Sequence, residues 1–144
     1  MKMNTRNKIY NVVIGSPNIE IVNYIKLAAS SIQSGISEIS IDVQNYNQLD
    51  RHLFVNQNNR TLLFIDCHFF VKFKQDIVNH TQHVFDFILI LDDNFTKGIL
   101  EKVKSISKKN FLNLLDYILA DNYTAPLIYY IAKQAILKKI HVNY

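Results

Sequence analysis

The chain has few of the residues that cross-link the backbone, interrupt its regular structure or allow sharp turns. Its 144 residues include one Cys, 2 Pro, 3 Gly and no Trp. A single cysteine cannot form an internal disulfide, which argues against a secreted, disulfide-stabilised scaffold. Neither a G-x-x-x-x-G-K-[ST] nor a G-x-G-x-x-G phosphate-binding loop is present, which argues against a nucleotide-binding enzyme.

Long hydrophobic runs are also lacking. The apolar runs are far shorter than the roughly 20 residues that span a bilayer. Residues 1–8 are positively charged, but no apolar stretch of a signal peptide follows them. We therefore expect a protein of the reducing cytoplasm that does not enter a membrane.

The composition that is present is that of a folded globular protein. Hydrophobic residues make up 49% of the chain and charged residues 19%, which excludes disordered or low-complexity material. The length predicts a single domain over residues 1–144. The net charge of +4 allows an acidic partner but does not by itself indicate nucleic acid.

Short apolar runs alternate with segments of helical period, which is typical of a mostly parallel sheet with helices on both faces. The residue at 16 is expected to cap the first helix and Pro17 to begin it. The pattern at 39–43 alternates apolar and polar residues, as in an edge strand. We predict strands at 9–14, 39–43, 62–65, 87–91 and 115–120, and helices at 17–33, 45–55, 70–77, 99–106 and 125–140.

An edge strand second in sequence fits the strand order 2-1-3-4-5, one of the common doubly wound arrangements. In that order the carboxyl ends of the other four strands meet at one crevice. The residues expected to line the crevice are Gly15, Ser16, Asp66, Asp92, Asp93, Ala120 and Asp121.

Three segments show a family pattern: VVIGSPNIEIVNYIKLAASSIQ at 12–33, TLLFID at 61–66 and DYILADNYTAPLIYYIAKQAI at 116–136. Together they make the chain resemble a bacterial response-regulator receiver domain over nearly its whole length. The LAD run at 119–121 is similar to receivers of LuxR-type transcription factors, which have a lysine and then an aspartate there. The resemblance implies a flavodoxin-like (CheY-like) three-layer sandwich with a five-stranded parallel sheet.

Receiver chemistry requires a carboxylate nucleophile, a divalent cation held mainly by carboxylates, a hydroxyl and a lysine. The resemblance implies that Asp66 stands at the phosphoacceptor position. The other positions hold unsuitable residues: Gly15 and Ser16 for the acidic pair, Leu91 or Asp92 for the hydroxyl, Ala120 for the lysine and Phe70 for a proline. We therefore expect a degenerate receiver that is not an enzyme, needs no cofactor and transfers no phosphate.

Two alternatives stay open at this crevice. Asp66, Asp92 and Asp121 could together rebuild a site for Mg²⁺ or Ca²⁺. In that case the protein would be a phosphorylatable receiver, or a magnesium-dependent phosphotransfer protein that uses Asp66. In the simpler interpretation Asp92 and Asp93 cap a helix and Asp121 belongs to a solvated loop.

Histidine and cysteine residues suggest two further sites, and we expect neither. His80 and His83 are three residues apart on a predicted helix, but no third ligand follows at a useful spacing. Cys67 and His68 follow Asp66, but adjacent residues after a strand point to different sides. A buried, inert cysteine is therefore expected in place of a thiol–imidazole dyad.

Lysines at 97, 102, 104, 108 and 109 form the predicted polar face of one helix. This segment has neither a recognition-helix turn nor aromatic residues for base stacking. DNA would thus be reached only through an attached or partner domain, as in LuxR-like regulators, and residues 138–144 contain no DNA-binding element. The domain is in this view the N-terminal part of a transcriptional regulator.

The final helix is apolar around more of its circumference than the roughly 100° that one buried face needs. One interpretation is that a second chain or domain covers its outer side, so that the module works by protein contact or dimerisation. The resemblance implies the same, because receivers use this region as a dimer or output surface. The other interpretation is that one domain buries the whole helix. The candidate interface residues are Tyr129, Tyr130, Leu137 and Ile140.

Overall fold

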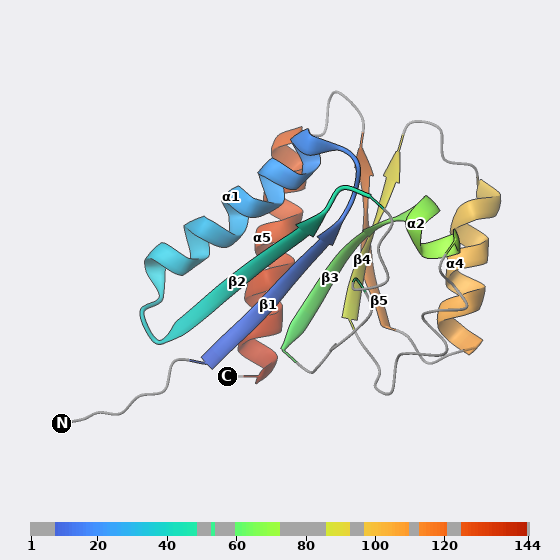
Figure 1. Cartoon of the computed structure of the whole chain (residues 1–144). Coiled ribbons are helices and arrows are strands. Elements are labelled where there is room, and N and C mark those ends of the chain that lie inside the picture. The colour runs from blue at the N-terminus through green and yellow to red at the C-terminus, as the bar shows by residue number, and fades with distance from the viewer. Residues whose placement is uncertain are drawn as a thin grey trace.

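The computed structural model describes residues 8–48, 53, 60–72, 86–92, 97–109, 113–120 and 125–143. The described strands form one five-stranded sheet in the order β2-β1-β3-β4-β5, and all four pairings are parallel. The predicted flavodoxin-like fold and strand order are confirmed (Figure 1). The elements are β1 (Lys8–Gly15), α1 (Ile19–Gly35), β2 (Ile39–Tyr46), β3 (Thr61–Asp66), α2 (Cys67–Lys72), β4 (Asp86–Asp92), α4 (Lys97–Lys109), β5 (Asn113–Ala120) and α5 (Ala125–Asn143).

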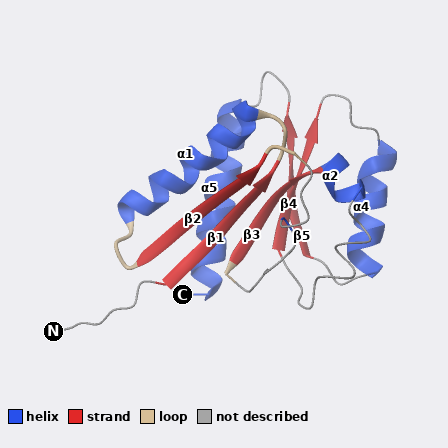
Figure 2. Ribbon diagram, in the orientation of Figure 1, coloured by secondary structure: helices blue, strands red, loops and turns tan. Residues whose placement is uncertain are grey.

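Helices cover the sheet on both sides, α1 and α5 on one face and α2 and α4 on the other (Figure 2). Side chains of the central strands alternate between two cores, as the two-residue period of a strand requires. Val12 of β1 and Phe64 of β3 belong to the core under α1 and α5. Val13 and Leu63 belong to the core under α2 and α4. This double burial explains the unbroken apolar runs of β3 and β4.

The start of α1 differs from the prediction by two residues. Asn18, not Ser16, is the N-cap: its Oδ1 accepts hydrogen bonds from the backbone N–H groups of Glu20 (3.1 Å) and Ile21 (3.3 Å). Ser16 Oγ accepts instead from the N–H of Asn18 at 3.1 Å. Asn18 has the extended backbone of a cap residue, so Pro17 lies before the helix and not in its first turn.

The strand β2 lies at the edge of the sheet, as predicted, but it is longer than predicted. Asn45 and Tyr46 pair with Ile14 and Gly15 of β1, so the helix expected at 45–55 does not begin where the pattern placed it. Pairing with β1 satisfies backbone groups along the whole strand, and this tertiary pairing overrides the local helical pattern. In the rest of that segment, residues 47–48 and Leu53 are described, and residues 49–52 and 54–55 lie outside the described residues.

A side chain protects part of the open edge of β2. Gln33 Nε2, near the end of α1, donates a hydrogen bond of 2.7 Å to the carbonyl oxygen of Ile39. Its Oε1 accepts from the backbone N–H of Ile41. The amide side chain thus pairs with one donor and one acceptor of the strand, as a neighbouring strand would. These hydrogen bonds connect α1 to the edge of the sheet.

The opposite edge strand, β5, contains an irregularity that the sequence pattern does not reveal. Phe87 of β4 pairs with Leu114, whereas the next residue, Ile88, pairs with Asp116. Leu115 is therefore the extra residue of a β-bulge, and its side chain is exposed. Of the predicted inner stripe at 70–77, Phe70 is buried and stacks on Phe87 at 5.0 Å, while Phe73 and Ile77 lie outside the described residues.

Candidate functional site

The carboxyl ends of the strands lie together at one edge of the sheet, where the sequence predicts a crevice. Gly15 of β1 pairs with Ile65 of β3, and Asp66 pairs with Ile90 of β4. The backbones of Asp92 and Ala120 end β4 and β5 as neighbours, but the structure does not describe their side chains. Asp93 and Asp121 lie outside the described residues. The site can thus be built from Gly15, Ser16 and Asp66.

Asp66 ends β3 as a nearly buried carboxylate that is 5% exposed. Its Oδ1 accepts a hydrogen bond of 2.8 Å from the backbone N–H of His68, in the first turn of α2. An aspartate that accepts from the residue two positions on is a common way to begin a helix or turn. Part of the carboxylate's hydrogen-bonding capacity therefore serves the β3–α2 junction.

A leucine occupies the space beside Gly15, where the resemblance places the first residue of an acidic pair. A Cβ atom built on Gly15 would lie 2.8 Å from Leu53 Cδ2 and 3.0 Å from Leu53 Cδ1. Leu53 is fully buried and belongs to the same core as Val13 and Leu63. Any side chain at position 15 would therefore require the buried end of the Leu53 side chain to shift.

The other half of the acidic pair is equally changed. Ser16 is fully buried. Its N–H donates to the carbonyl oxygen of Tyr46 at 3.0 Å, and its hydroxyl accepts from Asn18, so it joins the ends of β1 and β2 to α1. Ser16 is a structural residue of the β1–α1 turn, although not the cap that the sequence suggested.

These positions do not fit the magnesium ion of a receiver. Mg²⁺ prefers octahedral oxygen ligands with one or two carboxylates and several waters. Among the side chains described at the crevice, Asp66 is the only carboxylate. Leu53 fills the space beside Gly15 of β1. The cluster of Asp66 with Asp92 and Asp121 stays an open alternative, since the last two side chains are not described.

The structure corrects the expectation for Cys67 and His68. The chain becomes helical at Cys67, so successive side chains turn by about 100° and not by the 180° of a strand. As a result, one ligand atom each of Asp66, Cys67 and His68 lies within 4.8 Å of the others. Burial of Cys67 is confirmed. His80 and His83 lie outside the described residues.

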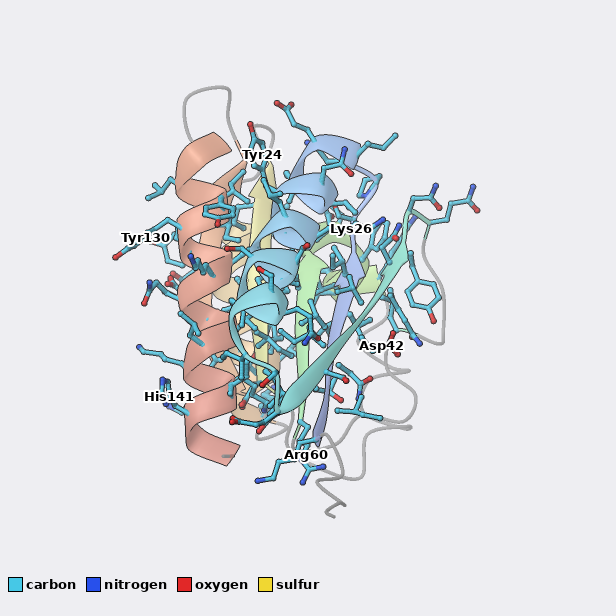
Figure 3. The ribbon with its side chains drawn as sticks, turned by 90° about the vertical axis from the view of Figure 1, so that its left-hand side faces the viewer. Tyr24, Lys26, Asp42, Arg60, Tyr130 and His141 are labelled. Atoms are coloured by element: carbon cyan, nitrogen blue, oxygen red, sulfur yellow. The ribbon has the colours of Figure 1, made fainter. Side chains whose placement is uncertain are left out.

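The four candidate interface residues of α5 separate into three environments. Tyr130 is 59% exposed and projects from the helix away from the sheet (Figure 3). Tyr129 and Leu137 are half-buried against the core. Ile140 is only 3% exposed, and its carbonyl oxygen accepts a hydrogen bond from the buried Tyr10 hydroxyl at 3.5 Å, so Ile140 is a core residue and leaves the candidate interface.

The wide apolar surface of α5 has an explanation within the domain. The helix packs on the sheet and on α1, so two of its sides are covered. A partly buried ion pair adds to this docking: Lys139 Nζ lies 2.7 Å from Asp86 Oδ2 at the start of β4. Much of the pattern that suggested a second chain is therefore explained by α1.

One apolar groove does remain open between β5 and α5, with a volume of about 240 Å³. Leu115, exposed by the β-bulge, and Tyr130 are its large accessible apolar residues. Asp116 and Lys138 bring opposite charges to it. We call it the β5–α5 groove, and it is lined by Ile88, Leu115, Asp116, Tyr130, Ile131, Gln134, Ala135 and Lys138.

No described helix is long and apolar enough to cross a membrane.

The lysines of α4 at 102, 104, 108 and 109 are exposed, which agrees with the predicted solvated face. The side chain of Lys97 is not described.

Comparison with known proteins supports the fold and no finer assignment. No protein-family model matches the chain, and no curated protein matches it. Among solved structures, it is similar to a response regulator from Colwellia psychrerythraea, with a TM-score of 0.57 and 13% sequence identity, over 87% of this chain and 98% of that one. At this identity the likeness establishes that the chain has the response-regulator receiver fold.

Proposed function

We propose that this protein is a receiver-like signalling module that works by protein contact, without phosphoryl transfer and without a magnesium cofactor. The observation that supports this most directly is the packing of Leu53 against Gly15, because it fills the place of an acidic metal ligand with a buried apolar side chain. The module would act in the cytoplasm as a regulatory partner, and any effect on transcription would pass through an attached or partner DNA-binding domain.

The charge balance at the crevice supports the proposal. A phosphoryl group on Asp66 would add about 1.5 to 2 negative charges at neutral pH. In phosphoryl-transfer proteins, metal ions and cationic side chains neutralise this charge. The residue at the lysine position is Ala120, and Gly15 and Ser16 replace the acidic metal ligands. The nucleophile position is therefore kept without the groups that would make its phosphorylation favourable.

The contact surface that we propose is the β5–α5 groove, and its proposed occupant is a second copy of this chain. In a twofold dimer the same surface faces itself, so each acidic group can meet a basic group of the other copy. The groove offers this complementarity, with exposed Asp116 and Lys138 beside the apolar Leu115 and Tyr130. If the chain is strictly monomeric in solution, the occupant would instead be a different protein with the same pattern of charges.

Phosphorylation of the intact chain tests the proposal. The protein is incubated with acetyl phosphate and Mg²⁺ and weighed by mass spectrometry, and beryllofluoride with Mg²⁺ is added to a parallel sample observed by amide NMR. We expect no phosphoryl adduct and no shift of the crevice amides. Addition of one phosphoryl group that disappears in Asp66→Asn would overturn the proposal. Asparagine is the control of choice, because its amide oxygen preserves the hydrogen bond to the His68 N–H.

A further inference from the structure

A carboxylate, a thiol and an imidazole lie together where β3 passes into α2. Their ligand atoms, from Asp66, Cys67 and His68, all lie within 4.8 Å of one another. In a tetrahedral zinc site with bond lengths of about 2.0–2.3 Å, donor atoms are about 3.3–3.8 Å apart. We propose that these three residues bind a zinc-type divalent transition metal ion, with the fourth position open to water or another ligand.

The donor types decide which metal fits. A thiolate and an imidazole suit Zn²⁺ and its neighbours, whereas Mg²⁺ takes oxygen ligands almost exclusively. Asp66 and Cys67, both ionised when bound, would together balance the charge of a divalent ion. The proposed centre therefore differs from the magnesium site implied by the resemblance in two of its three ligands and in the metal that it selects.

The backbone already places these three groups on one side of the junction. The 2.8 Å hydrogen bond from the His68 N–H to Asp66 Oδ1 fixes the carboxylate relative to the first turn of α2. Such bonds orient metal ligands in known sites. Cys67 is held by the core that also contains Phe70 and Leu63, so its sulfur has little freedom.

Of the three proposed ligands, His68 is the exposed one, and a metal ion would reach the site beside it. Its side chain is exposed, and it lines a cavity of about 380 Å³ that also borders Phe69 of α2 and Ile99 of α4. Figure 1 shows α2 beside α4 at the carboxyl end of β3. An exposed imidazole can change its rotamer without a rearrangement of the backbone.

A cobalt titration tests the site directly, because Co²⁺ takes the place of Zn²⁺ and shows an absorption when sulfur is bound. We expect one Co²⁺ per chain, a near-ultraviolet sulfur-to-cobalt charge-transfer band, and loss of that band on adding Zn²⁺. Cys67→Ser should abolish the band. His68→Ala should weaken binding by at least about tenfold, since loss even of a group that only orients a ligand lowers affinity by about 10–100-fold.

Matched controls separate this site from other histidines. His141 is exposed on α5, far along the chain from the cluster, so His141→Ala should leave the affinity and the spectrum unchanged. Binding without a charge-transfer band overturns the proposal, as does binding that is lost in His80→Ala/His83→Ala but retained in His68→Ala. Because His68 is exposed, its replacement should not unfold the domain, and circular dichroism confirms this. The result is independent of the phosphorylation test, which reads a covalent adduct.

Discussion

The crevice and the β5–α5 groove differ in what they bury. At the crevice, where the resemblance implies an acidic pair, the space beside Gly15 is filled by the fully buried Leu53. At the groove, where an isolated domain would be polar, Leu115 and Tyr130 are exposed. The first region thus contains buried apolar packing, whereas the second has exposed apolar area. The difference supports a protein that works by contact.

The largest effect should come from emptying the crevice. Leu53→Ala removes a fully buried side chain from the core that contains Val13 and Leu63, and we expect a loss of about 2–5 kcal/mol in the free energy of unfolding. Urea denaturation measures it. Leu27→Ala is the matched control: Leu27 is exposed on α1, so its loss should stay within about 0.5 kcal/mol. Similar values for the two variants would mean that the crevice is not packed in solution.

The next effect should come from adding one carbon atom at the same place. Gly15→Ala puts a methyl group 2.8 Å from Leu53 Cδ2, so we expect overpacking to cost about 1–3 kcal/mol. In the Leu53→Ala background the methyl group has room, and the cost should largely disappear. A double-mutant cycle on the free energy of unfolding gives this coupling. Additive effects would contradict the direct contact between positions 15 and 53.

The smallest effect should be seen at the groove, on association and not on stability. Tyr130→Glu should weaken self-association by about tenfold, about 1.4 kcal/mol, because it puts a charge at the centre of an apolar contact. Light scattering at several protein concentrations measures this. Leu27→Glu, on an exposed part of α1, should leave association unchanged.

Charge reversal sharpens the same test. Lys138→Glu should weaken the dimer, and adding Asp116→Lys should restore part of the loss if the two groups meet across a twofold axis. A wild-type chain that stays monomeric at high concentration would exclude the second copy as occupant and leave a different protein in its place.

Much of the fold is predictable because side chains on one face recur every second residue in a strand and every three to four residues in a helix. The unbroken apolar runs of β3 and β4 predicted central strands, and the alternation at Ile39, Ile41 and Val43 predicted the edge strand; both predictions are confirmed. The observed element boundaries differ from the predicted ones. The N-cap of α1 is Asn18 and not the predicted Ser16, because either side chain can accept from a free backbone N–H at a helix start.

The candidate site was predictable in position but not in content. Strand order alone placed Gly15, Ser16 and Asp66 at one end of the sheet, because parallel strands share their carboxyl ends. Nothing local indicated that Leu53 would pack on Gly15, since the two are far apart in sequence. The β-bulge at Leu115 was equally hidden, because it arises from the register between β4 and β5.

The amino-acid sequence by itself determined which segments become strands and helices, and the order of the strands. Only the tertiary structure decided that Ile140 is internal, that Tyr130 is accessible, and that Asp66, Cys67 and His68 lie together. The physical reason is that periodicity records which side of an element is apolar. Which distant side chain fills a given space depends on how the elements pack.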